Sequence, residues 1–173
     1  MGKKWGSNED IHVGDIFHCY SAGIPSSGRP KYYQVVALRG KTQVVLHAIR
    51  SETFFNEGIP GTDLWEDGLN RTRPLPGQFM TEQEMWEICA FEVRGKWVRI
   101  TGEEVTAWVQ PERRPDGRPW LLEVGPGGWR LGYYYELERP EDWEPWTAET
   151  FKRWEEEDRA RQAEQAKKAE SQS

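Results

Sequence analysis

The feature that most constrains the fold of this chain is a pair of apolar runs joined by a short polar turn. Residues 31–38 and 42–50 consist mainly of β-branched, aromatic and other apolar side chains, and the turn between them contains Gly40. Two such runs separated by a Gly-containing turn predict a β-hairpin. Successive side chains of a strand point to opposite faces, so residues 31–38 place apolar groups on both faces. We therefore expect a strand covered on both sides, as in a small barrel or sandwich.

Further short apolar segments, separated by turn residues, continue this pattern. Residues 51–80 are rich in Gly and Pro and have no sustained period, so they are expected to form an irregular loop. Thr81 followed by Glu84 matches a capping box, which predicts a short helix. Strands are expected at 13–20, 103–110, 118–124 and 129–138, and a second hairpin within 88–100 around Arg94-Gly95-Lys96.

The end of the chain changes character at Thr147, a favourable N-cap residue. Phe151 and Trp154 fall on one face of the helix that would begin there, and few apolar residues follow them. The sequence thus predicts a mainly β (α+β) protein, a small antiparallel barrel or meander of about seven or eight short strands with a C-terminal charged helix. We expect one β-rich domain at residues 1–146 and the helix at 147–173, with its distal part solvated.

The charge distribution argues against general binding of nucleic acid. The 173 residues carry a net charge of −6. Residues 1–50 hold 7 Lys or Arg against 3 Asp or Glu, a net +4, whereas residues 51–110 hold 5 against 11, a net −6. Affinity for nucleic acid comes mostly from cations that neutralise phosphates. Acidic surface can instead meet basic grooves on other proteins, or it simply aids solubility.

Neither cysteine content nor hydropathy points to export or to a membrane. Cys19 and Cys89 lie far apart in sequence, and no basic start, apolar run and cleavage site occur together. No stretch approaches the roughly 18 uncharged apolar residues of a membrane span. We expect a soluble protein in a reduced, cytoplasmic setting.

The residues that could carry chemistry are few and scattered. His12, His18, Cys19 and His47 are potential zinc ligands, but their spacing matches no zinc pattern. His18 and Cys19 are adjacent strand residues that point to opposite faces, so they cannot form a base and nucleophile pair directly. We therefore predict no catalytic residues, no metal and no cofactor.

Aromatic residues are abundant, with 10 Trp, 6 Tyr and 6 Phe. Most are expected in the core. Residues 133–135 are three successive tyrosines, so Tyr134 or its neighbours must face away from the core. Trp129, Trp143 and Trp146 lie nearby in sequence, and exposed Tyr and Trp often anchor protein interfaces. The competing interpretation is that Trp143 and Trp146 pack the C-terminal helix against the barrel.

Several of these segments together resemble a known group of proteins. "VGDIF" at 13–17, "YYQVVALRGKTQVVLHAI" at 32–49, "WVRI" and the later "DGRPWL" are similar to small proteins of phages and mobile elements of Gram-positive bacteria. These share a Gly-Asp-Ile-Phe strand, a Tyr-Gln-Val-Val strand and an Asp-Gly turn. Similar gut-phage proteins include inhibitors of host defence, Cas9 inhibitors among them. The resemblance implies that role and assigns no residues to it.

Together these observations predict a non-catalytic, phage-borne binding protein. We expect it to inhibit a bacterial defence nuclease in an anti-CRISPR-like manner, by contact with a Cas nuclease or its guide-RNA complex in the host bacterial cytosol. An acidic surface would occupy a basic groove and mimic phosphate, with aromatic anchors beside it. The residues predicted for this contact are Asp63, Glu66, Asp67, Glu103, Glu104, Trp129, Tyr134, Trp143 and Trp146.

The alternative is a nucleic-acid-binding accessory protein. It would use the basic N-terminal segment, with Lys31, Arg39 and Lys41 as phosphate contacts and exposed aromatic rings as stacking platforms. A third class, a hydrolase that uses His and acidic residues, has no motif in the sequence.

Overall fold

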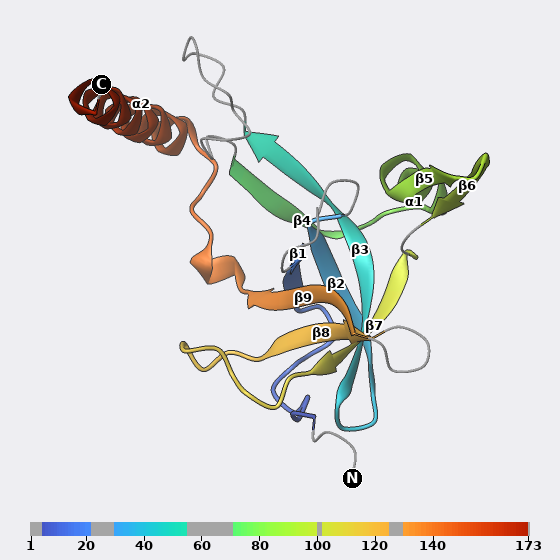
Figure 1. Ribbon diagram of the computed structural model, residues 1–173. Coiled ribbons are helices and arrows are strands. Elements are labelled where there is room, and N and C mark those ends of the chain that lie inside the picture. The colour runs from blue at the N-terminus through green and yellow to red at the C-terminus, as the bar shows by residue number, and fades with distance from the viewer. Residues whose placement is uncertain (1–4, 22–29, 55–70, 100–101, 125–129, 173) are drawn as a thin grey trace. The chain divides into compact units, whose positions relative to one another are not determined.

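The predicted N-terminal hairpin forms, and the pairing of its two strands closes the sheet into a barrel. In the computed structural model, β2 (Tyr32–Arg39) pairs antiparallel with β3 (Gln43–Phe54), from Tyr32 opposite Ile49 to Arg39 opposite Gln43. Gly40 lies in the turn with a φ of 56°, a conformation that L side chains rarely adopt. The structure describes residues 5–21, 30–54, 71–99, 102–124 and 130–172 (Figure 1).

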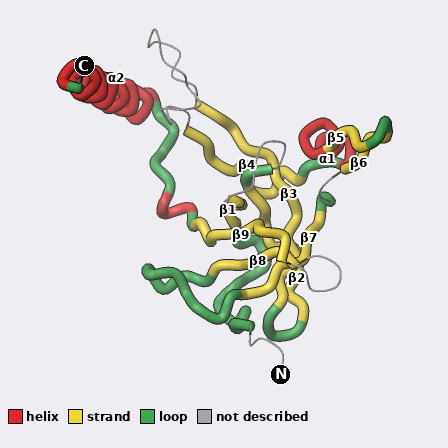
Figure 2. Tube along the Cα trace, viewed as in Figure 1, coloured by secondary structure: helices red, strands yellow, loops and turns green. Residues whose placement is uncertain are grey.

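Six strands close into an antiparallel barrel. Their order is β2-β1-β9-β8-β7-β3, the β2–β3 pairing closes the ring, and β4 extends the sheet beyond β3 (Figures 1 and 2). The prediction of a mainly β protein with a barrel and a C-terminal helix is confirmed, with nine strands among the described residues. The remaining strands of this sheet are β1 (Ile16–Ser21), β4 (Arg71–Phe79), β7 (Glu104–Val109), β8 (Trp120–Val124) and β9 (Arg130–Glu138).

Alternate residues of the barrel strands point inward and form one buried cluster. Tyr33 of β2 and Tyr135 of β9 are both fully buried and meet edge to face, with ring centroids 5.3 Å apart. Burial of each large apolar side chain contributes roughly 1.5–3 kcal/mol relative to exposure. The cluster consists of Ile11, Phe17, Cys19, Tyr33, Val35, Val44, Leu46, Ala48, Met80, Met85, Cys89, Ala107, Val109, Leu121, Tyr135 and Leu137.

The prediction of an irregular loop throughout residues 51–80 is wrong at both ends of that range. β3 continues to Phe54, and residues 71–79 form β4. Pro74 and Pro76 hid this strand from the sequence pattern, because proline cannot donate a hydrogen bond within a sheet. Proline is tolerated on an edge strand, and β4 is the last strand of the sheet beyond β3. Residues 55–70 lie outside the described part of the chain.

The second predicted hairpin forms next to the predicted short helix. α1 (Glu82–Cys89) is followed by β5 (Ala90–Val93) and β6 (Lys96–Arg99), which pair as a two-stranded sheet. We call residues 82–99 the αββ segment. The helix begins at Thr81 with the predicted capping box, in which the Thr81 side chain accepts from the Glu84 N–H and Glu84 reaches back to the Thr81 N–H. Ile88 and Cys89 belong to this helix, not to the hairpin as predicted.

The contacts of the chain divide it into two compact units. The first contains residues 1–51 and 74–139, and the second contains residues 52–73 and 140–173, so the predicted domain boundary at residue 146 falls inside the second unit. That unit also contains a 3-10 turn, η2 (Pro140–Asp142).

The C-terminal helix begins where the sequence predicted. In α2 (Ala148–Ser171), the Thr147 side chain accepts from the Thr150 N–H. Thr150, Trp154 and Asp158 are buried at a spacing of four residues, and every described residue after Gln162 is exposed. Of the helices described, none combines the length and apolar character needed to cross a membrane.

Candidate functional site

The acidic residues predicted to contact a partner are only partly visible. Asp63, Glu66 and Asp67 lie outside the described residues. Glu103 is half-buried, and its Oε1 accepts from Nη1 of Arg99 at 3.2 Å. Glu104 is exposed at the start of β7, where it pairs in register with His47. The described part of this predicted surface is therefore one exposed carboxylate beside one ion pair.

The predicted aromatic anchors separate into different surroundings. Trp129 lies outside the described residues. Tyr134 is half-buried on β9, with its ring 6.0 Å from that of Trp120. Trp146 lies in the second unit, 6.1 Å from the Trp154 ring and 5.8 Å from the Phe151 ring of α2. This placement agrees with the competing interpretation in one respect, since Trp146 packs against the C-terminal helix.

The second unit is held together by arginines stacked on indole rings. The guanidinium of Arg73 lies 4.6 Å from the centroid of the Trp146 ring, and that of Arg71 lies 5.4 Å from that of Trp154. Arg71 also donates to the buried carboxylate of Asp158 at 3.0 Å. A half-buried Trp143 lines the same hollow as these side chains. These contacts join residues 71–73 to α2 and to the chain before it within the second unit, and we assign them a structural role.

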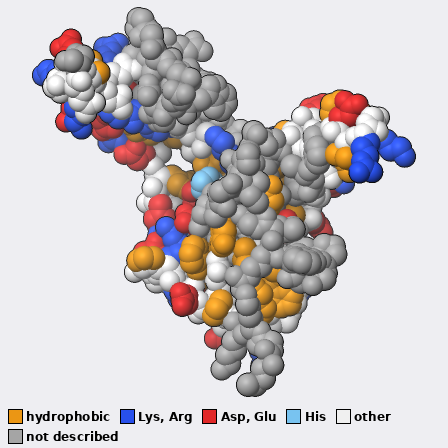
Figure 3. Space-filling view, in the orientation of Figure 1, with side chains coloured by type: hydrophobic (Ala, Val, Ile, Leu, Met, Phe, Trp, Pro, Cys, Tyr) orange, Lys and Arg blue, Asp and Glu red, His pale blue; other side chains and the backbone are white. Residues whose placement is uncertain are grey.

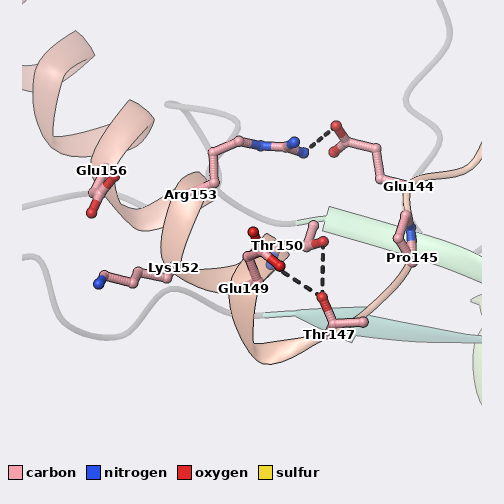
Figure 4. A pocket seen from close by; sticks show the side chains of 8 residues that line it. All are labelled: Glu144, Pro145, Thr147, Glu149, Thr150, Lys152, Arg153 and Glu156. Carbon is pink, nitrogen blue, oxygen red and sulfur yellow. Dashed lines mark hydrogen bonds and ion pairs between the residues drawn. The ribbon is translucent and has the colours of Figure 1, made fainter.

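A hollow at the start of α2 has two of its charged residues, Glu144 and Arg153, engaged in internal contacts (Figure 4). Arg153 forms an ion pair with Glu144, whose other carboxylate oxygen accepts from the indole N–H of Trp154 at 2.7 Å. The Thr147 hydroxyl accepts from the Thr150 N–H at 3.2 Å. These interactions cap the helix and attach the chain that precedes it.

Of the basic residues of the alternative function, Lys31 lies apart from Arg39 and Lys41. Lys31 precedes β2, whereas Arg39 ends it and Lys41 lies in the following turn, and all three are exposed. A strand rises about 3.3 Å per residue, so Lys31 and Arg39 lie about 25 Å apart along β2. They do not form one continuous basic patch on this strand.

The histidines and Cys19 point in different directions. Cys19 is in the barrel core, whereas His18 faces the other way, with its ring 5.3 Å from that of Tyr32. Burial lowers the pKa of His18, against the opposing effect of the Glu136 carboxylate. His47 packs against Phe79 at 4.9 Å, and His12 is exposed. No group of three His, Cys, Asp or Glu side chains able to hold a metal ion occurs among the residues that the structure describes.

The αββ segment is anchored to the barrel by one side of its helix. Met85 and Cys89, four residues apart, are buried in the core cluster. Arg50 of β3 donates through Nε to Glu84 Oε2 at 2.8 Å and through Nη2 to Glu84 Oε1. Such a two-pronged guanidinium–carboxylate contact fixes geometry as well as charge. It holds α1 against the end of β3.

The remaining sides of the αββ segment expose an apolar surface. Trp97 is 67% exposed, Val98 42%, Val93 41%, and Trp86 and Ile88 37% each. Hydrophobic and basic side chains appear together on the part of Figure 3 that corresponds to this segment in Figure 1. Five large apolar side chains are exposed within 18 consecutive residues, on α1 and on both faces of the hairpin, whereas single exposed apolar residues are ordinary. We call these five residues the αββ patch.

The two faces of the hairpin differ. Trp97 and Arg99 lie on the face that α1 covers, where the guanidinium of Arg99 is 5.5 Å from the centroid of the Trp86 ring. A cleft on this side is lined by Gln83, Trp86, Glu87, Ala90 and Trp97. Val93 and Val98 lie on the opposite face, because residues paired across the hairpin share a face and neighbours alternate. The hairpin closes with a two-residue turn, in which Arg94 and Gly95 both have positive φ.

The anchor of this segment should depend on pH. The hydrogen bond from Arg50, followed by those from Thr81, lowers the pKa of the Glu84 carboxyl from 4.5 to about 2. A carboxyl with a depressed folded pKa stabilises the fold fully above its unfolded pKa, and this contribution is lost as the pH falls through the folded value. We expect the contribution of Glu84 to disappear between about pH 4.5 and pH 2. The melting temperature of the wild type should fall between these two pH values, and in Glu84→Gln this fall should be smaller. An equal fall in the two proteins would contradict the predicted role of Glu84.

Comparisons with protein-family models, curated proteins and solved structures found no match for this chain. The candidate site is therefore assigned from the exposed residues of the αββ segment alone. The sequence pattern predicted a second hairpin within residues 88–100 but not the exposed apolar side chains of this segment. The signal was present in α1, where Trp86 and Ile88 add apolar residues beside the buried pair Met85 and Cys89, so that more than one face is apolar.

Proposed function

We propose that this protein is a non-catalytic binding protein that acts by protein–protein contact, and that it inhibits a bacterial defence nuclease as its resemblance to phage proteins implies. The observation that carries the proposal is the αββ patch. Exposed clusters of large apolar and aromatic side chains mark surfaces that other proteins cover. Within such surfaces, Trp residues commonly contribute most of the binding energy.

The charge of the segment favours a protein partner over nucleic acid. Residues 82–99 hold 4 Asp or Glu against 3 Lys or Arg, a net of −1. Of the three cations, Arg99 is engaged by Glu103 and contacts Glu82, so Arg94 and Lys96 are the exposed ones. Binding of nucleic acid requires several cations that neutralise phosphates, and its strength follows their number. An apolar pocket on a protein fits the patch better.

Inhibition would follow because this protein occupies surfaces that the nuclease needs for its target DNA. Trp97, the most exposed side chain of the patch, would enter an apolar pocket of the nuclease, while Arg94 and Lys96 beside it would meet carboxylates at the rim. The acidic residues predicted from the sequence, including the exposed Glu104, would face the basic groove that the target duplex occupies. The partner is a Cas nuclease or its guide-RNA complex, in the host cytosol.

The proposal is tested with a guide-loaded Cas9-type nuclease from a Gram-positive host, by measuring cleavage of its target DNA at increasing concentrations of this protein. Trp97→Ser should raise the concentration needed for half-inhibition by about 30-fold or more, because truncation of a central interface Trp costs about 2 kcal/mol or more. Val13→Ser is the matched control, since Val13 is 65% exposed but lies outside the patch. Equal inhibition by wild type and a folded Trp97→Ser variant would rule out this surface.

The alternative function makes the opposite prediction. A nucleic-acid-binding accessory protein should bind DNA or RNA with an affinity that falls steeply with salt, and reversal of Lys31, Arg39 and Lys41 to Glu should weaken that binding. We expect no tight binding of bare nucleic acid at physiological salt. Tight, salt-dependent binding that these reversals abolish would establish the alternative.

A further inference from the structure

Within the part of the chain that the structure describes, no strand pairs with the outer edge of β6. Val93 and Lys96 flank the two-residue turn, and in such a hairpin these two residues exchange hydrogen bonds. Hydrogen-bonded and non-hydrogen-bonded pairs alternate along an antiparallel ladder, so Val98 also bonds to β5. The backbone N–H and C=O groups of Trp97 and Arg99 then point away from β5. β6 contains no proline, whereas the edge strand β4 is blocked by two.

We propose that two copies of this chain associate by antiparallel pairing of their β6 edges. The backbone groups of Trp97 and Arg99 point outward in each copy. Only one two-fold symmetric register lets Trp97 of one copy exchange hydrogen bonds with Arg99 of the other. In it, Val98 of each copy lies on the symmetry axis, opposite Val98 of the other copy. Trp97 of one copy then lies opposite Arg99 of the second. The two hairpins become one four-stranded sheet, and this inference does not depend on inhibition of a nuclease.

Charge complementarity identifies a second copy as the occupant of this edge. The turn end of β6 carries exposed Arg94 and Lys96. The other end carries carboxylates, since Glu82 and Glu103 lie 4.0 Å and 3.2 Å from the guanidinium of Arg99. Antiparallel pairing places the basic end of each β6 beside the acidic end of its partner, and the symmetry repeats this match. The surface is therefore complementary to itself.

The side-chain pairs of this register are also favourable. An indole ring opposite a guanidinium permits a cation–π contact, and Arg99 already lies near the Trp86 ring on that face. On the opposite face, the two Val98 side chains would meet beside Val93, which is 41% exposed in a single chain. A two-stranded hairpin alone is marginally stable in water, and a four-stranded sheet is not. The contact area is small, so a weak, concentration-dependent dimer is expected.

Sedimentation equilibrium of the full chain tests the proposal. The average mass of the wild type should rise toward twice that of the chain as concentration increases. Val98→Lys and Val98→Glu should each remain monomeric at the concentration where wild type is dimeric, because like charges then meet on the axis. An equimolar mixture of the two should recover the dimer. Val93→Lys and Val93→Glu, on the same face but off the axis, are matched controls that should still dimerise.

A backbone variant gives an independent readout. Trp97→Pro removes the outward-pointing N–H, and it should dimerise less than Trp97→Ala, which keeps that group. Glu92→Pro places the same change on the other edge of the hairpin and should leave the dimer intact. The proposal is overturned if wild type is monomeric at every concentration. It is also overturned if both Val98 variants dimerise alone as wild type does, or if their mixture stays monomeric.

Discussion

Leu46→Ala should lower the free energy of unfolding of the first unit by about 2–5 kcal/mol. Leu46 is fully buried in β3, where it lies opposite Val35 of β2 and Val105 of β7. Truncation removes apolar contacts at the seam of the barrel and leaves a cavity that two neighbouring strands cannot both fill. Chemical denaturation, followed by tryptophan fluorescence, measures the change.

The control is the same substitution in the other strand of the hairpin. Leu38 is 39% exposed near the end of β2, so Leu38→Ala should cost much less, about 0.5 kcal/mol or below. Similar costs at the two positions would mean that the barrel interior is not where the structure places it.

Trp154→Ala should release α2 from the second unit and leave the barrel folded. Trp154 is 5% exposed and donates to Glu144 at 2.7 Å, with its ring 5.7 Å from that of Phe151. Loss of a buried Trp typically costs about 3–5 kcal/mol. Trp154 is the one large apolar residue among the described residues of this helix that are buried, and helices in proteins gain most of their stability from tertiary packing of such residues. Amide hydrogen exchange should therefore accelerate throughout residues 148–162 while the barrel strands keep their protection.

Trp97→Ala is the matched control for that experiment. It removes an indole that is 67% exposed in the first unit, and protection of α2 should not change. If Trp154→Ala instead unfolds both units together, the two units are energetically coupled, which the division of contacts does not predict.

Much of the fold could be predicted from local patterns. The hairpin of β2 and β3 follows from two apolar runs and a glycine turn, and the capping box at Thr81 and the N-cap at Thr147 both begin helices. In each case the pattern and the interaction that enforces it lie within a few residues of each other. Strand β4 was missed because its identity depends on its position at a sheet edge, which two prolines tolerate and which no local pattern reports.

The candidate site was harder to predict because exposure is a property of the folded chain. The segments around Gly40 and Gly95 look alike in sequence, with apolar residues on both sides of a turn. Tertiary packing distinguishes them, since among the described strands β3 pairs with three others whereas β6 pairs with β5 alone. Leu46 is therefore fully buried and Trp97 mostly exposed. The opposite orientations of His18 and Cys19 were predicted correctly, because the alternation of side chains along a strand needs no tertiary information.

Amide hydrogen exchange of this protein with and without a guide-loaded Cas9-type nuclease tests whether the αββ patch is the binding surface. We expect slower exchange on binding in residues 83–99, which carry the αββ patch, and no slowing around Arg39 and Lys41. At protein concentrations where the free chain is monomeric, such protection reports the nuclease contact and not a second copy. Inhibition of cleavage without any protection of residues 83–99 would show that the αββ patch is not the binding surface. Protection around Arg39 and Lys41 produced by bare DNA alone would favour the nucleic-acid-binding function instead.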